Sequence, residues 1–96
     1  MKTLHEIIRV LGEQKEVLKK KHKVKMIKIF GSYAKEEQKE SSDIDLIVDF
    51  EEPPTFIEFI RFQEELEKLL GVKVDLLTEE SISPFIKPYI KEVVEI

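Results

Sequence analysis

Two aspartates, Asp43 and Asp45, lie two residues apart in a segment that is otherwise apolar. In a β-strand, side chains at i and i+2 project from the same face, about 6.5–7 Å apart. Two carboxylates at that separation can converge on one divalent cation, or on two cations held roughly 4 Å apart. Mg²⁺ suits such a site, because it takes one or two carboxylates and completes its shell with water and substrate phosphate. A structural alternative stays open, in which Asp43 caps the preceding turn and Asp45 lies at a solvated strand edge.

The surroundings of the two acids favour the metal site. Aspartate is depleted in strand interiors, and two close carboxylates repel each other unless a cation lies between them. The run from Ile44 to Val48 otherwise predicts a buried strand. Residues that break a local pattern in this way more often serve function than structure. Asp49 lies farther along the same face, and we interpret it as a surface acid.

A third acid, Asp75, lies in another apolar segment. By itself it is interpreted as a solvent-facing residue beside Lys73. If its strand neighbours the strand of Asp43 and Asp45, it completes an acidic triad. Asp75 would then be a third metal ligand or the general base that acts on an acceptor hydroxyl.

Gly31 and Ser32 follow one apolar segment and precede a segment of helical character. Glycine lets the backbone approach a phosphate closely, and the amides at the start of a helix point toward an anion. The Ser32 hydroxyl adds a donor, and Lys35 adds a positive charge on the first turn. Most Gly-Ser pairs are simple turns, so these residues indicate a phosphate site mainly through their position before Asp43 and Asp45.

The composition restricts the class of protein. The chain has 96 residues, with 16 Lys and Arg, 20 Asp and Glu and a net charge of −4. This balance argues against a protein that coats nucleic acid, because neutralisation of phosphates drives such binding. There is no cysteine, which excludes disulfides and thiolate metal sites. No apolar run approaches the roughly 18–20 residues of a membrane span, and we expect one cytoplasmic domain, residues 1–96.

The periodicity of apolar residues predicts the elements that position these side chains. Their order predicts an α/β (α+β) fold with a mixed sheet of three or four strands flanked by helices. The first expected helix begins at a Thr3–Glu6 capping box and closes in the basic run Lys19–Lys23. Three strands are expected, at Val24–Phe30, Asp43–Phe50 and Val72–Leu77, with a helical turn at Tyr33–Lys39 and a helix from Thr55 to Leu70 between them. A last helix is expected from Pro84, and a short closing strand around Val93–Ile96.

The motif and its spacing resemble those of a known family. The segment from Ile29 to Lys35 reads Ile-Phe-Gly-Ser-Tyr-Ala-Lys, and ten residues, Tyr33–Ser42, separate Ser32 from Asp-Ile-Asp-Leu. This combination resembles the signature of the DNA polymerase beta-like nucleotidyltransferases. The short chain is similar to their minimal members in bacteria and archaea, and the resemblance covers most of it. It implies the palm-like fold of that superfamily.

By position, the resemblance implies a role for each candidate residue. Gly31 and Ser32 would hold the triphosphate of ATP. Asp43 and Asp45 would bind Mg²⁺, and Asp75 would be the third catalytic and metal-binding carboxylate.

The chain departs from the family pattern after the alanine of the motif. Many relatives have arginine and then glycine there, where this chain has Lys35 and Glu36. Lysine keeps the positive charge but loses the bidentate fork of arginine. The departure concerns the nucleotide-binding role of Lys35 and leaves the metal site unaffected.

Minimal members often stand beside small helical proteins of the HEPN type, as antitoxin and ribonuclease toxin. Some antitoxins that resemble this chain transfer AMP from ATP to a tyrosine of the toxin. The resemblance therefore implies a Mg²⁺-dependent protein adenylyltransferase that forms a hetero-oligomer with a HEPN-type toxin encoded nearby. One alternative is a non-catalytic antitoxin that neutralises its partner by contact alone. Another is transfer to a small molecule, which usually requires a second domain.

The size of the chain favours a protein acceptor, because 96 residues leave no lobe that grips a small one. A partner's surface can supply that grip. The basic run from Lys19 to Lys25 is a candidate for docking an acidic partner.

Overall fold

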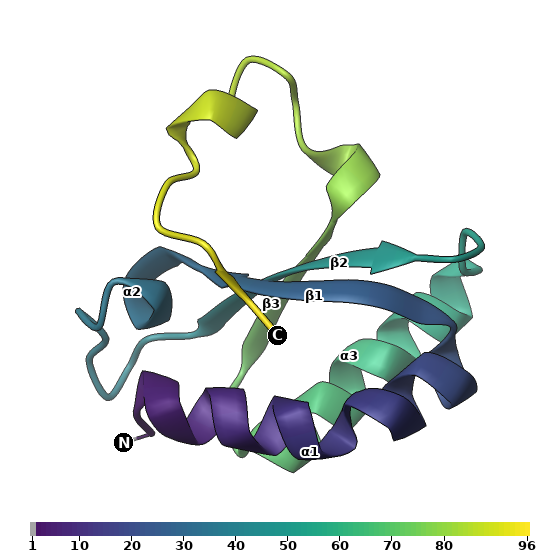
Figure 1. Ribbon diagram of the computed structural model, residues 1–96, viewed down its shortest axis with the longest axis horizontal. Helices are drawn as coiled ribbons and strands as arrows, with labels where there is room; N and C mark the ends of the chain where they lie inside the picture. Colours follow the sequence, from purple (N-terminus) through teal and green to yellow (C-terminus); the bar gives the residue numbers. More distant parts are fainter. Residues whose placement is uncertain (1) are drawn as a thin grey trace.

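The computed structural model describes residues 2–96, so Met1, the first residue of the expected domain, lies outside the described residues. The two long helices lie under one face of a sheet, and a segment near the C-terminus arches away from the other face (Figure 1). The elements are α1 (Leu4–His22), β1 (Val24–Phe30), α2 (Gly31–Ala34), β2 (Ile44–Phe50), α3 (Phe56–Leu70), β3 (Val74–Thr78), the 3₁₀ turns η1 (Glu79–Ser81) and η2 (Lys87–Tyr89), and β4 (Val94–Glu95).

The sheet is mixed, with the strand order β3-β2-β1-β4. β1 runs antiparallel to both β2 and β4, whereas β2 and β3 are parallel. Parallel neighbours need a crossover connection, and α3 provides it. The sequence prediction of a small α/β (α+β) domain with a mixed sheet flanked by helices is therefore confirmed.

The long helix α1 begins at the predicted capping box. The Thr3 side chain accepts a hydrogen bond from the Glu6 backbone, and the Glu6 side chain accepts one from the Thr3 backbone. The helix ends at Lys23, which adopts a left-handed conformation with φ 57°. Its buried side chains are Ile7, Leu11 and Leu18, which recur at helical spacing and face the sheet.

The second long helix, α3, follows the same design. Thr55 and Glu58 form a reciprocal capping box, and Gly71 closes the helix with φ 68°. A glycine reaches this left-handed conformation without a steric penalty. The buried residues of α3 are Phe62, Leu66 and Leu70.

The helix-covered face of the sheet forms the hydrophobic core. Alternate residues of the central strand, Ile44, Leu46 and Val48, have no exposed surface. Burial of each such side chain contributes about 1.5–3 kcal/mol relative to an exposed one. The neighbouring strands add buried side chains to the same face, namely Ile27, Ile29, Val74 and Leu76.

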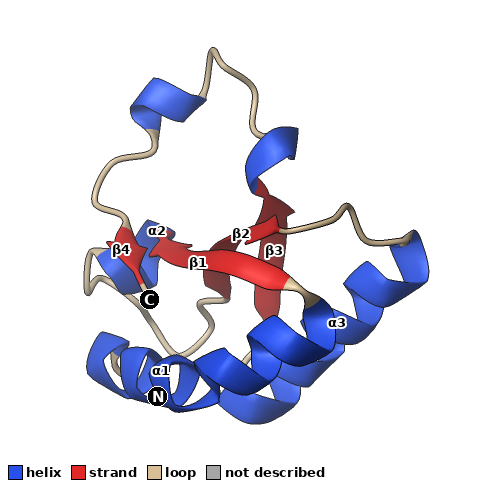
Figure 2. Cartoon of the chain, turned by 45° about the vertical axis from the view of Figure 1, so that its right-hand side comes forward, coloured by secondary structure: helices blue, strands red, loops and turns tan. Residues whose placement is uncertain are grey.

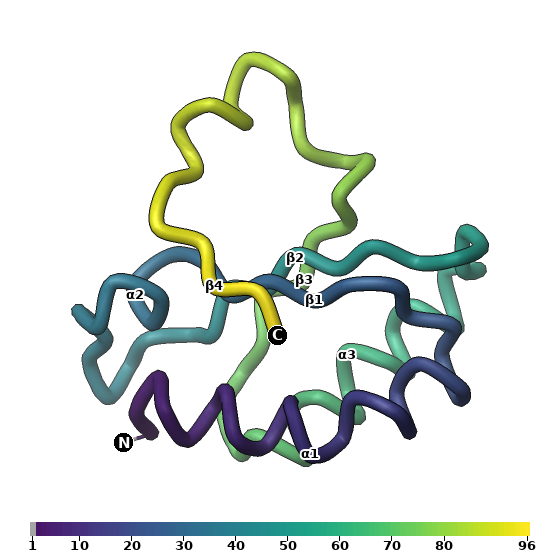
Figure 3. The backbone as a smooth tube through the Cα atoms, viewed as in Figure 1, coloured from purple at the N-terminus to yellow at the C-terminus, as the bar shows by residue number. Residues whose placement is uncertain are grey.

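The opposite face of the sheet, which we term the open face, carries the other set of alternating side chains, including Asp45 and Asp49. Residues 79–93, which we term the arch, leave the end of β3, rise above this face and return to β4 (Figure 3). Glu79 holds the base of the arch, because its Oε1 lies 3.7 Å from Nζ of Lys28 on β1 and 3.4 Å from Nζ of Lys87. Figure 2 shows that the arch is mostly loop.

Three of the expected elements have other bounds in the structure. The helical turn expected at Tyr33–Lys39 is α2, which begins earlier, at Gly31, and ends at Ala34. The second strand begins at Ile44 rather than Asp43, and the third spans Val74–Thr78 rather than Val72–Leu77.

The last helix, expected from Pro84, does not form. Residues Lys87–Tyr89 make only one 3₁₀ turn. A helix through this segment would place Pro88 four residues after Pro84, where the proline ring clashes with the carbonyl of residue i−4 and has no N–H to donate. The closing strand does form, but it is limited to Val94–Glu95. None of the helices in residues 2–96 is both long and apolar enough to cross a bilayer.

Candidate active site

The candidate site begins where β1 ends, at Gly31. This residue has φ 74°, a conformation that favours glycine. The preceding residue, Phe30, pairs with Asp45 across the sheet. As a result the Gly31 backbone packs against the Asp45 carboxylate, and a Cβ built at position 31 would overlap Oδ2 of Asp45. The geometry therefore requires glycine here both for backbone conformation and for space.

Asp45 and Asp75 are direct neighbours in the sheet. They are register partners in the parallel pair β2–β3, and both project from the open face. Asp45 is half-buried and Asp75 is exposed. Burial raises the pKa of Asp45 from its ordinary 3.8 to about 6, with the charges of Asp75 and Asp43 and a hydrogen bond with Asp75 as further causes.

Asp43 lies just before β2, on the loop that enters the strand, and it is exposed. Its charge raises the pKa of Asp45, so the side chain lies within electrostatic range of the other two acids. It also contributes to the raised pKa of Tyr33, although burial of that phenol is the larger cause. Tyr33 is buried in the hydrophobic core, so it anchors α2 to the rest of the domain. The structure thus brings Asp43, Asp45 and Asp75 together beside Gly31.

The predicted phosphate-binding residues lie on and after α2. Ser32 is partly exposed in this single turn of helix. The backbone N–H of Lys35 donates to the carbonyl of Gly31 at 3.2 Å, and its side chain is exposed to solvent. The roles of Gly31, Ser32 and Lys35 in nucleotide binding remain predictions; the Gly31 backbone lies against Asp45 of the carboxylate cluster.

Two residues of the loop after α2 have structural roles that the sequence did not reveal. Glu36 has φ 57°, a left-handed backbone conformation that favours glycine. This conformation is the physical reason for the glycine that many relatives have at this position. Gln38 ties the loop to the start of the chain, because its side-chain amide donates to the carbonyl of Lys2 at 3.2 Å. The family pattern indicates the special position of Glu36. No local pattern indicates the role of Gln38, because its partner Lys2 is far away in the sequence.

The carboxylate cluster fits Mg²⁺ in its chemistry. In residues 2–96, the structure contains no group of three or more His, Cys, Asp or Glu side chains that could hold a metal ion. Mg²⁺ does not require one, because it usually takes one or two carboxylates and completes its octahedron with water and phosphate. Burial raises the pKa of Asp45 most, and the negative charges of Asp75 and Asp43 raise it further; a bound cation would offset that repulsion. Asp43 and Asp45, with Asp75 beside them, provide the hard oxygen ligands that such an ion prefers.

This geometry can now be compared with known proteins. Residues 11–96 match a family model described as a nucleotidyltransferase domain. The chain belongs to this nucleotidyltransferase family. It is therefore a nucleotidyltransferase, and its substrate is a nucleotide.

Relatives match nearly the whole chain. A Methanocaldococcus jannaschii protein provisionally named as a protein adenylyltransferase is 53% identical over 93 residues, which cover 96% of this chain and 95% of the relative. The protein adenylyltransferase MntA of Thermococcus cleftensis is 45% identical over 95 residues, which cover 98% and 96%.

Solved structures share the fold. A structure described provisionally as a minimal nucleotidyltransferase superimposes with a TM-score of 0.78 at 35% identity, covering 99% of this chain and 95% of that one. A chain from a toxin–antitoxin structure with AMP-PNP has a TM-score of 0.62 at 28% identity, covering 86% and 62%. A chain from a complex of a tri-AMPylated Shewanella oneidensis HEPN toxin with its MNT antitoxin has a TM-score of 0.53 at 25% identity, covering 86% and 58%.

Proposed function

We propose that this nucleotidyltransferase transfers AMP from ATP to a tyrosine hydroxyl of a HEPN-type toxin and acts as its antitoxin in the cytoplasm. The similarity to a named protein adenylyltransferase over nearly the full length supports a protein acceptor. The similar fold found in a complex with an AMPylated HEPN toxin supports the class of partner. The observation that carries the proposal is the clustering of three carboxylates beside Gly31 on the open face of the sheet.

The proposed reaction is a displacement at the α-phosphorus of ATP. The tyrosine oxygen forms a bond to the α-phosphorus, the bond to the bridging oxygen of the β-phosphate breaks, and pyrophosphate leaves. Asp43 and Asp45 would hold Mg²⁺, which neutralises phosphate charge when bound. Asp75 is exposed on the neighbouring strand β3, so it can accept the proton of the incoming hydroxyl.

The other residues of the site position the nucleotide. Gly31 leaves room for a close approach to the backbone, and Ser32 and Lys35 offer a hydroxyl and a positive charge at the same edge. Rates in such a site come mainly from positioning and charge stabilisation. The acceptor has to be presented by the partner, because in the described residues no second lobe stands beside the open face.

Intact mass spectrometry tests the proposal. The chain is mixed with ATP, Mg²⁺ and the HEPN-type protein encoded beside it, which we term the HEPN partner, and the partner is weighed. We expect one or more added AMP units, absent when Asp43→Asn replaces the wild type. Neutralisation of the partner with no added mass, and equally strong with Asp43→Asn, would instead establish an antitoxin that works by contact alone.

A further inference from the structure

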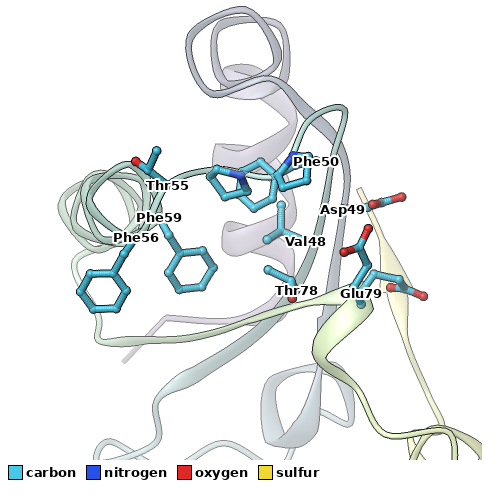
Figure 4. Close-up of a pocket in the computed structure, with 11 residues that line it drawn as sticks. Val48, Asp49, Phe50, Thr55, Phe56, Phe59, Thr78 and Glu79 are labelled. Carbon is cyan, nitrogen blue, oxygen red and sulfur yellow. The ribbon is translucent and has the colours of Figure 1, made fainter.

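A separate pocket lies at the carboxyl end of β2, away from the carboxylate cluster at the amino end. Its volume is about 320 Å³, and it opens between the carboxyl ends of β2 and β3 and the first turn of α3. Apolar side chains, among them Val48, Phe56 and Phe59, form one wall. Asp49 and Glu79 lie on the opposite side (Figure 4), and Glu80 completes an acidic rim. We term this cavity the docking pocket.

The apolar wall is rigid at its base and exposed at its mouth. The ring of Phe50, which also lines the pocket, packs against Phe59 with centroids 6.5 Å apart and against the buried Phe62 at 5.6 Å. Such aromatic pairs favour fixed geometries. Phe56, at the mouth, is 79% exposed, and the adjacent Ile57 is 63% exposed. Exposed apolar side chains gathered at a pocket are typical of interaction sites.

The rim carries negative charge that the chain itself only partly neutralises. Glu79 has two cationic neighbours, Lys28 and Lys87. Asp49 and Glu80 form no ion pair with the residues that the structure describes. A ligand that fills the apolar part of the pocket would therefore gain from a positive charge placed against the rim.

The docking pocket and the carboxylate cluster belong to the same strand. Asp45 and Asp49 are four residues apart on β2, so they project from the same face and lie about 13 Å apart along the strand. A protein anchored in the pocket would therefore contact one end of the strand that carries Asp45 near its other end. A distance of about 13 Å suits a partner whose acceptor hydroxyl lies a short way from the side chain that fills the pocket.

We propose that the docking pocket seats the protein acceptor of AMP, through an apolar side chain that has a lysine or arginine beside it. The inference rests on the proposed function, because it takes the acceptor to be a protein. It adds the surface of this chain that recognises the acceptor and the chemistry of the recognised segment. The anchor fills the space among Phe50, Phe56 and Phe59, and the cation faces Asp49 and Glu80.

Two other occupants fit the same observations less well. A second copy of this chain would bring a net charge of −4 toward an acidic rim, and that repulsion opposes association. A small molecule would find a pocket near the lower limit of ligand sites, which usually enclose most of the ligand. Here one wall is an exposed phenylalanine, which a larger partner can cover.

Two variants separate docking from catalysis. Phe56→Ala removes the exposed wall, and we expect the KM for the HEPN partner to rise about tenfold or more, as for loss of an aromatic anchor. Glu80→Lys reverses the rim charge and should raise that KM by about three- to tenfold, with a smaller effect at high salt. In both variants, kcat at saturating partner and the Kd for ATP should stay within about twofold of wild type.

Phe85→Ala is the matched control, because Phe85 on the arch is 85% exposed and does not line the docking pocket. It should leave the KM for the partner unchanged. Thermal melting of each variant checks the fold, and the exposure of Phe56 and Glu80 predicts little change. A KM that rises with Phe85→Ala but not with Phe56→Ala would move the docking site to the arch and overturn the inference.

Photocrosslinking gives a readout that does not require transfer. The photoreactive residue p-benzoylphenylalanine is placed at position 56 or, as the control, at position 85, and the chain is irradiated with the HEPN partner without ATP. We expect a crosslink from position 56 to a partner segment that contains an apolar residue next to Lys or Arg. A crosslink only between copies of this chain, or none from position 56 to a partner that does bind, would refute the docking pocket.

The two proposals can fail separately. If the partner crosslinks at position 56 and gains no AMP, the proposed reaction is wrong and the docking pocket stands. If it gains AMP while Phe56→Ala and Glu80→Lys leave its KM unchanged, the reaction stands and the docking pocket is wrong.

Discussion

The two ends of β2 carry acidic side chains on the same face, but in different surroundings. At the amino end, Asp45 lies against Gly31 and beside Asp75, half-buried, and its pKa is raised to about 6. At the carboxyl end, Asp49 stands on the rim of an apolar pocket. Crowded, partly buried carboxylates are unfavourable until a cation joins them, whereas a rim acid is solvated and available to a partner. The same residue type on one strand thus suits two different tasks.

The largest expected difference is in nucleotide binding. Asp43→Asn combined with Asp45→Asn should abolish Mg²⁺-dependent ATP binding and AMP transfer, because both proposed metal ligands are lost. Asp49→Asn, on the same face at the other end of the strand, should bind ATP as the wild type does. Isothermal titration calorimetry with and without Mg²⁺ measures both. Equal ATP affinity for the double variant and the wild type would show that the nucleotide does not bind at the amino end of β2.

Asp75→Asn tests whether the carboxylate on β3 performs chemistry. Loss of a general base typically costs 10²–10⁴-fold in rate, and loss of a bridging ligand can cost more. We expect kcat for AMP transfer to fall by about that factor, while the Kd for ATP changes much less. Single-turnover assays and calorimetry report the two quantities. A normal transfer rate would reduce Asp75 to a surface residue beside Lys73.

The raised pKa of Asp45 predicts a pH-dependent stability without metal. Because the pKa in the folded state, about 6, lies above the ordinary 3.8, the folded protein binds the proton more tightly than the unfolded chain. The resulting stabilisation is complete below about pH 4 and is lost as the pH rises through 6. Asp45→Asn cannot ionise and avoids this loss. In EDTA its melting temperature should exceed that of the wild type by a few degrees at pH 8, and the gap should close toward pH 4.

Magnesium provides the control for this stability difference. If Mg²⁺ binds at Asp45, adding it at pH 8 should raise the melting temperature of the wild type more than that of Asp45→Asn, since a ligand stabilises only the state that binds it. A pH-independent gap between the two proteins would show that the substitution acts through packing rather than charge.

The amino end of β2 was largely predictable from the sequence, because its signals are local. The alternation of apolar residues around Asp45 marks the strand, and Gly31 follows another apolar run at a fixed spacing. The capping boxes at Thr3 and Thr55 are likewise short patterns, and both are present. What the sequence left open was the proximity of Asp75, since it depends on the parallel register of two strands joined by a crossover helix.

The carboxyl end of β2 was not predictable in the same way. The docking pocket is built from a strand end, a proline turn, the first turn of α3 and the base of the arch, and no spacing in the sequence connects them. Asp49 was interpreted as a surface acid, which describes its exposure but not its neighbours. A helix was expected from Pro84, within the arch, and Pro88 explains why it does not form.

The smallest predicted effect concerns backbone strain on the loop that leads to the amino end. Glu36 has φ 57°, a conformation that costs an L-residue roughly 1–2 kcal/mol, and glycine loses about 0.5–1 kcal/mol through the greater freedom of the unfolded chain. Glu36→Gly should therefore stabilise the protein by about 0.5 kcal/mol, measured by urea denaturation. Glu92 on the arch has φ 55°, so Glu92→Gly should give a similar gain. A gain at only one position would show that the two loops differ in how firmly the fold holds them in this conformation.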